Sequence, residues 1–171
     1  TAIRSASGRT FDEHQAHLGR LYADLSAVAA KNPHAWIQEA KTADEIVTVT
    51  ERNRMIGLPY PKLLNSNNGV DMAAAVIMCS VAAARRLGVP EDRWVFPHAG
   101  TDCHEHQFVS NRDTFARTPA IEIGGRRALE LAGIGIDDVS VIDLYSCFPA
   151  AVQLGAQSLG STATATQAFS A

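Results

Sequence analysis

The chain has 171 residues, enough for one domain with a hydrophobic core. Its 46% hydrophobic and 19% charged residues are typical of a globular protein. The net charge of −3 excludes a broad basic surface for nucleic acid, and no apolar stretch is long enough to span a bilayer. Three cysteines, an odd number, argue against a secreted disulfide framework and predict a cytoplasmic location.

The first third of the chain predicts two helices followed by irregular structure. Apolar residues recur at helical spacing after Thr10, and Asn32-Pro33 ends that helix. Thr42 opens Thr-Ala-Asp-Glu-Ile46, the pattern of a capping box before a short second helix. Residues 47–64 carry prolines on both sides of Tyr60, so we expect a loop or edge structure there.

The rest of the chain alternates continuous apolar runs with helical patterns. The predicted strands are residues 72–79, 93–96 and 139–144. The predicted helices are residues 82–87, 119–132 and 148–159, and residues 161–171 form a low-complexity tail or linker. This alternation predicts the α/β class, with a sheet covered by helices.

The most informative stretch runs from Gly133 to Phe148. Gly133 suits the C-cap of a helix, and the predicted strand that follows ends immediately before Tyr145, Ser146 and Cys147. Ligands and catalytic groups gather beyond the carboxyl ends of strands in open α/β sheets. The position therefore predicts a functional site, with one alternative left open: Tyr145 and Cys147 pack, and Ser146 caps the next helix.

A polar loop, residues 98–113, gathers His98, Cys103, His104 and His106. The Cys-His-x-His spacing is not that of a common zinc module, so we predict no metal site. The loop either covers a binding cleft with a histidine near the substrate or carries no chemistry. The sequence also lacks a glycine-rich phosphate loop of the Walker or dinucleotide type.

Together these segments resemble a thiolase. Residues 121–148 resemble the C-terminal half of that family, in which a helix, a glycine turn and a strand lead to Asn-Glu-Ala-Phe or, in the sterol-carrier-protein branch, to His-Asp-Cys-Phe. The tetrad here is Tyr145-Ser-Cys-Phe148. Residues 68–75 resemble the thiolase Asn-Asp-Gly-Ala-Ala-Ala turn and strand, and residues 18–61 resemble the end of the loop domain. The resemblance covers most of residues 10–160 and is greatest to actinobacterial thiolase-like proteins described as acetyl-CoA acetyltransferases or lipid-transfer proteins.

The resemblance implies part of a five-layered thiolase fold, usually assembled as a homodimer or tetramer. It implies three segments: the end of the loop domain in residues 1–64, the α/β core in 65–160 and the tail in 161–171. It also implies thioester chemistry on an acyl-CoA substrate without a covalently bound cofactor. Tyr145 and Ser146 would be catalytic, and His104, His106 and Phe148 would contact the substrate.

The sequence departs from the thiolase pattern in two ways. The segments with the acyl-carrying cysteine and with Gly-His-Pro and a second cysteine are not among these residues, so we expect a middle piece of a longer protein. Tyr145 replaces asparagine or histidine, and a phenol can donate a hydrogen bond or transfer a proton but cannot mimic imidazole. Three functions stay open: an acyltransferase of fatty or steroid lipid metabolism, a steroid-CoA retro-aldolase that uses Tyr145, and a non-catalytic binding subunit.

Overall fold

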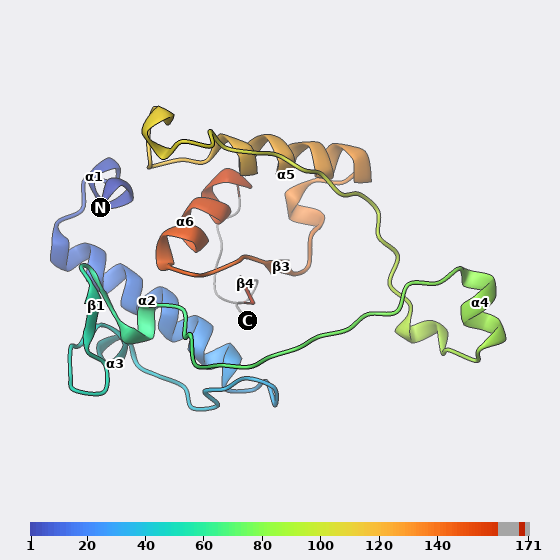
Figure 1. Cartoon of the computed structure of the whole chain (residues 1–171), viewed down its shortest axis with the longest axis horizontal. Helices are drawn as coiled ribbons and strands as arrows, with labels where there is room; N and C mark the ends of the chain where they lie inside the picture. Colours follow the sequence, from blue (N-terminus) through green and yellow to red (C-terminus); the bar gives the residue numbers. More distant parts are fainter. Residues whose placement is uncertain (161–167, 170–171) are drawn as a thin grey trace.

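Helices alternate with short strands along the chain in the computed structural model, which describes residues 1–160 and 168–169 (Figure 1). The α-helices are α1 (Ala2–Ala6), α2 (Phe11–Ala29), α3 (Ala43–Val47), α4 (Val81–Arg86), α5 (Pro119–Ala132) and α6 (Pro149–Ser158). The 3-10 helices are η1 (Lys62–Leu64), η2 (Glu91–Arg93), η3 (Val109–Asn111) and η4 (Ile136–Asp138). The strands are β1 (Met55–Gly57), β2 (Tyr60–Pro61), β3 (Ile142–Asp143) and β4 (Ala168–Phe169). None of the helices in these residues has the length and apolar character needed to cross a membrane.

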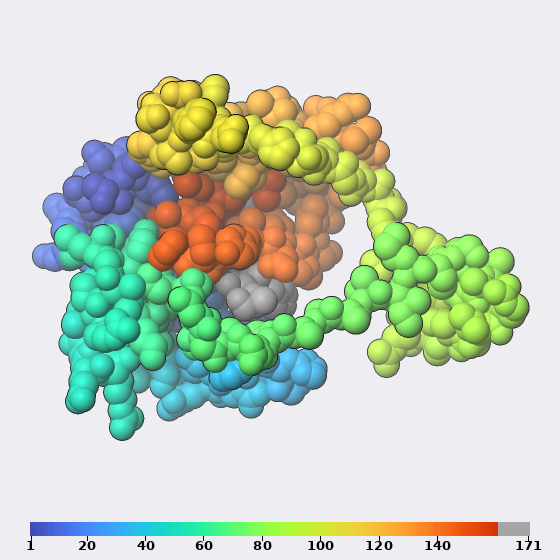
Figure 2. All heavy atoms as spheres, viewed as in Figure 1, coloured from blue at the N-terminus to red at the C-terminus, as the bar shows by residue number. Residues whose placement is uncertain are grey.

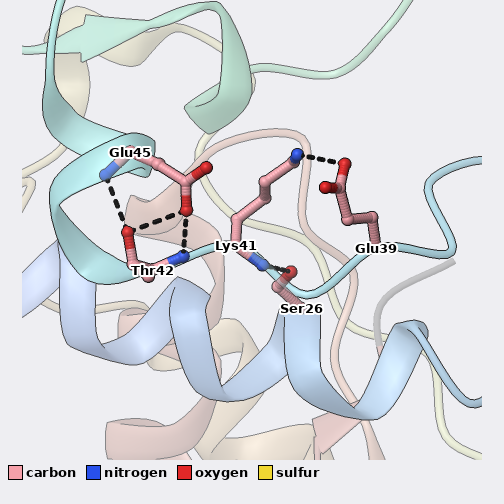
Figure 3. Close-up of polar contacts among 5 residues, drawn as sticks. All are labelled: Ser26, Glu39, Lys41, Thr42 and Glu45. Carbon is pink, nitrogen blue, oxygen red and sulfur yellow. Dashed lines mark hydrogen bonds and ion pairs between the residues drawn. The ribbon is translucent and has the colours of Figure 1, made fainter.

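Two capping boxes fix where α2 and α3 begin. At α2 the amide of Glu13 donates to the Thr10 hydroxyl, and the Glu13 carboxylate accepts from the Thr10 amide at 2.8 Å. Thr42 and Glu45 repeat this arrangement at α3, as Figure 3 shows. Hydrogen bonds from the backbone amide and then the hydroxyl of each threonine lower the pKa of Glu13 and Glu45. Both predicted helix starts are confirmed.

The first core forms where α2 crosses α3. Leu18, Ile46 and Leu64 are buried against one another, with Tyr22 and Tyr60 packed around them. Gly19 permits this contact, because a Cβ at that position would lie 2.8 Å from the backbone oxygen of Ala43. The two helices therefore approach closely enough to bury their apolar faces.

Asn53 ties the chain after α3 to this core, with only 5% of its surface exposed. Its side-chain amide donates to the backbone oxygens of Ile46 at 3.0 Å and Thr48 at 2.9 Å, and its Oδ1 accepts the Leu63 amide at 2.9 Å. Residues 47–64, predicted as loop or edge structure, contain the small antiparallel sheet β1-β2 and the 3-10 helix η1. Asn53 holds that segment against α3.

The second packed region joins α5, β3 and α6 (Figure 1). Helix α5 has the bounds that the sequence predicts and ends at Gly133, whose φ of +72° is the left-handed cap favoured by glycine. Strand β3 covers only two residues of the predicted strand 139–144 and pairs in parallel with β4. The predicted tail, 161–171, otherwise lies outside the described residues. Proline at the first position of α6 matches the predicted final helix.

Two predicted strands are wrong. Residues 72–79 have no regular structure, and Val76, Ile77 and Met78 are 88%, 93% and 87% exposed, whereas the sequence predicts a buried strand. Residues 93–96 complete η2 and continue as irregular chain. A strand persists only where a neighbouring strand takes its N–H and C=O groups. Within the described residues the sheets are β1-β2 and β3-β4, so neither run has such a neighbour. Cys79, the last residue of the first of these predicted strands, is exposed as well.

These irregular segments lead to and from α4, which begins and ends close to its predicted bounds. Figures 1 and 2 show α4 apart from both packed regions, joined to them by two extended runs of chain. Ser80 caps α4 by accepting the Ala83 amide at 3.2 Å, and Gly88 follows with a φ of +68°. The contacts of this helix come from the segment that follows it, through the Arg85–Glu91 ion pair and the Arg85 guanidinium over the Trp94 ring.

We predict that Asn53→Ala lowers the free energy of unfolding by about 2–3 kcal/mol, because the half-buried Leu63 amide and the Ile46 and Thr48 carbonyl groups lose this partner. Urea unfolding followed by circular dichroism measures this loss. The control, Asn111→Ala at an exposed asparagine, should change stability by less than about 0.5 kcal/mol. An equal effect of both variants would contradict the role assigned to Asn53.

Candidate functional site

A cavity of about 480 Å³ lies between α2, residues 32–41 and the tetrad 145–148. Ligand pockets for small molecules usually measure about 300–1,000 Å³. Its apolar wall includes Leu25, Val28, Trp36, Ile37, Leu63 and Met72. Its polar side chains include Tyr22, Ser26, His34, Lys41, Tyr145 and Ser146. A largely apolar wall with several polar groups suits a ligand that has an apolar part and a polar head.

The backbone at the tetrad is held from both sides. The Ser66 amide donates to the Cys147 oxygen at 3.1 Å, which fixes the turn after η1 against the tetrad. Phe148 is the N-cap residue of α6, and its ring stacks on Tyr60 with centroids 5.9 Å apart. No side chain provides a cap hydrogen bond at this helix start, so the alternative that Ser146 caps α6 is wrong.

Ser146 instead shares a hydrogen bond with Tyr22, across 124 residues of sequence. The two oxygens lie 2.5 Å apart, and both side chains line the cavity. Burial raises the pKa of Tyr22 to about 12, while the hydrogen bond to Ser146 opposes that rise. The phenol is therefore neutral at physiological pH and retains its proton as a donor.

Tyr145 lies at the mouth of the cavity, with 79% of its surface exposed. It also lines a second hollow of about 380 Å³, walled by Phe115, Ile121 and Leu154 among others. The phenol is thus reachable from solvent and borders two hollows. A side chain in this position can contact both the solvent and a ligand bound in the cavity.

Lys41 also lines this cavity, and Figure 3 shows its side chain directed to Glu39. Its backbone amide donates to the Ser26 hydroxyl at 2.8 Å, which attaches residues 39–41 to α2. Its side chain pairs with Glu39, and that hydrogen bond raises the pKa of Lys41. The Lys41 ammonium therefore stays charged and paired with Glu39 at physiological pH.

His104 and His106 line a separate hollow of about 350 Å³, together with Cys103, Glu105 and Arg112. Glu105 anchors this loop to the start of α5 by accepting the Thr118 hydroxyl at 2.6 Å and the Ala120 amide at 3.0 Å. These bonds lower the pKa of the Glu105 carboxyl, with the Thr118 bond the larger cause. Across residues 1–160 and 168–169, no three His, Cys, Asp or Glu side chains are grouped to hold a metal ion.

The structure therefore brings together only part of the predicted site. Tyr145 and Ser146 share the main cavity, whereas the two histidines border another hollow and Phe148 packs on Tyr60. Substrate contact by His104, His106 and Phe148 stays a prediction. Sequence reasoning missed Tyr22 as a polar partner, because helical spacing identified it only as part of the apolar face of α2.

No family model matches the chain, but two known proteins are similar to it. The chain is 26% identical to a benzoylsuccinyl-CoA thiolase subunit, BbsB, of Thauera aromatica over 133 residues, which are 77% of this chain and 32% of that protein. A solved monomeric SCP2-thiolase-like protein type 1 from Mycobacterium smegmatis is similar with a TM-score of 0.78 and 37% identity. That match covers 93% of this chain and 35% of the solved chain. The chain thus spans about a third of the length of each relative.

The fold is therefore a partial α/β thiolase fold, and the predicted class is confirmed. The chain belongs to the thiolase-like family, as the tetrad and the turn before it indicated.

We predict that the stability of the wild-type protein falls more steeply with pH above about 10 than that of Tyr22→Phe. The folded state raises the pKa of Tyr22 to about 12, so the unfolded chain loses this proton first. The stabilising contribution is complete below the ordinary tyrosine pKa and is lost as the pH rises toward 12. Denaturant unfolding at several alkaline pH values measures the slope. The control Tyr145→Phe keeps Tyr22 and should keep the steep decline; equal slopes for wild type and Tyr22→Phe would contradict the assignment.

Proposed function

We propose that this chain forms the acyl-binding part of a thiolase-like protein that acts on acyl-CoA thioesters. The observation that carries the proposal is the 480 Å³ cavity, whose largely apolar wall also contains the hydroxyl groups of Tyr22, Ser146 and Tyr145. Similarity to a subunit named for a CoA thiolase supports a CoA thioester as the ligand. The acyl group would be a fatty or steroid acid, and no covalently bound cofactor is needed.

In this proposal the apolar chain lies along Leu25 and Val28, and the thioester carbonyl lies near Ser146. The reaction would be acyl transfer, in which negative charge develops on that carbonyl oxygen. A donor placed in advance at such an oxygen is worth about 3 kcal/mol of barrier. His104 and His106 would meet a more distant part of the substrate, and the working protein would be a cytoplasmic homo-oligomer.

We predict that Ala29→Phe weakens acyl-CoA binding at least about tenfold, because the added ring fills part of the cavity that Ala29 lines. Isothermal titration calorimetry with a medium-chain acyl-CoA, on the protein that carries this sequence, measures the affinity. Ala27→Phe is the matched control, since Ala27 is exposed on the same helix. No binding by wild type, or equal affinities of the two variants, would contradict the proposal.

A second candidate is a retro-aldolase, favoured by the exposed phenol of Tyr145 at the cavity mouth. Such an enzyme cleaves a carbon–carbon bond by removing the proton of a β-hydroxyl group. A tyrosine near the ligand can accept that proton in its phenolate form.

We predict, for this candidate, that Tyr145→Phe abolishes cleavage of a steroid-CoA aldol adduct while preserving its binding. Product analysis by liquid chromatography measures turnover, and calorimetry measures affinity. Tyr60→Phe, a substitution at a half-buried tyrosine that packs on Phe148, is the control. Unchanged turnover in Tyr145→Phe would exclude the retro-aldolase. Binding without turnover by wild type would favour the non-catalytic subunit.

A further inference from the structure

We propose that Tyr22 is a positioning residue that directs the Ser146 hydroxyl toward the carbonyl oxygen of the bound thioester. The inference deepens the proposed function and rests on it. It assigns a role to a side chain on α2, in a part of the chain far from the tetrad in sequence.

The phenol of Tyr22 is held firmly in place. Helix α2 is fixed at its start by the Thr10 capping box and packs closely on α3 at Gly19. The Tyr22 ring packs against the buried cluster of Leu18, Ile46 and Leu64, so its position follows from the core. A hydroxyl fixed in this way can set the direction of a flexible partner, and serine has such a rotating hydroxyl.

The opposite partner is held as well. Ser146 follows β3, and the next residue, Cys147, accepts the Ser66 amide through its backbone oxygen. The Tyr22 and Ser146 oxygens meet at 2.5 Å on the cavity wall. The contact therefore joins two fixed backbone segments at the wall of a largely apolar cavity.

The chemistry of the two hydroxyl groups gives the contact a direction. A phenol is the more acidic of the two and stays protonated here, because burial raises its pKa. Tyr22 then donates to Ser146, and the serine hydrogen is directed away toward another acceptor. A donor that itself accepts a hydrogen bond is polarised and binds its acceptor more strongly. The carbonyl oxygen of a thioester in the cavity is such an acceptor.

A pair of ligands that differ only at the carbonyl tests this inference. One is an acyl-CoA thioester, and the other is the thioether of equal chain length, in which a methylene replaces the carbonyl group. Calorimetry on the protein that carries this sequence compares wild type with Tyr22→Phe, Ser146→Ala and the double variant. Ser146→Thr retains a hydroxyl, and Tyr60→Phe removes a phenol whose ring packs against the same core cluster.

We expect Tyr22→Phe and Ser146→Ala each to weaken thioester binding about fivefold to tenfold, the size of one hydrogen bond. Thioether binding should stay unchanged, and Tyr22→Phe should have no further effect once Ser146 is alanine. Ser146→Thr should keep more of the thioester affinity than Ser146→Ala, because it retains the hydroxyl, and Tyr60→Phe should bind both ligands like wild type.

Equal losses for both ligands, or additive effects of the two substitutions, would show that the contact is merely structural and overturn the inference. An unchanged thioester affinity in either variant would do the same. If Tyr22→Phe does not fold, the thioester and thioether affinities of Ser146→Ala are compared with those of Ser146→Thr. Equal thioester affinities of these two variants would then overturn the inference. Failure of wild type to bind either ligand would instead reject the proposed function, and the inference with it.

Discussion

The close contact of α2 with α3 at Gly19 is the constraint on which the candidate site depends. A side chain larger than hydrogen there would meet the Ala43 carbonyl, and the helices would separate. With glycine at position 19 the helices stay in contact, so Leu18 and Ile46 are buried together. Tyr22, one turn further along α2, is fixed beside them. One face of α2 thereby stabilises the core, while its continuation forms a cavity wall.

The sequence predicts those parts of the fold that depend on neighbours close in the chain. Thr10, Thr42 and Gly133 mark helix ends correctly because a cap and its partners lie within a few residues. The apolar run 72–79 was expected to be a buried strand, yet a strand depends on partners far away in sequence. Hydrophobicity alone does not specify whether such a partner is available, and here the described residues provide none.

The candidate site also has a part that the sequence predicts and a part that depends on residues far apart in the chain. Tyr145 and Ser146 were predicted from their position after a strand, a local property, and they do line the main cavity. Tyr22 comes from another element, and its partnership with Ser146 spans 124 residues. His104 and His106 lie close to Cys103 in sequence and share a hollow with it, but no sequence pattern indicated that this hollow is distinct from the cavity at the tetrad.

The exposed run Val76-Ile77-Met78 also affects how the chain behaves in concentrated solution. Its backbone belongs to neither described sheet, and its side chains are almost fully exposed. An apolar extended segment of this kind can add to the open edge of another molecule. The net charge of −3 provides only weak repulsion between molecules to oppose such pairing. The segment most open to association therefore lies outside the α2–α3 core on which the fold depends.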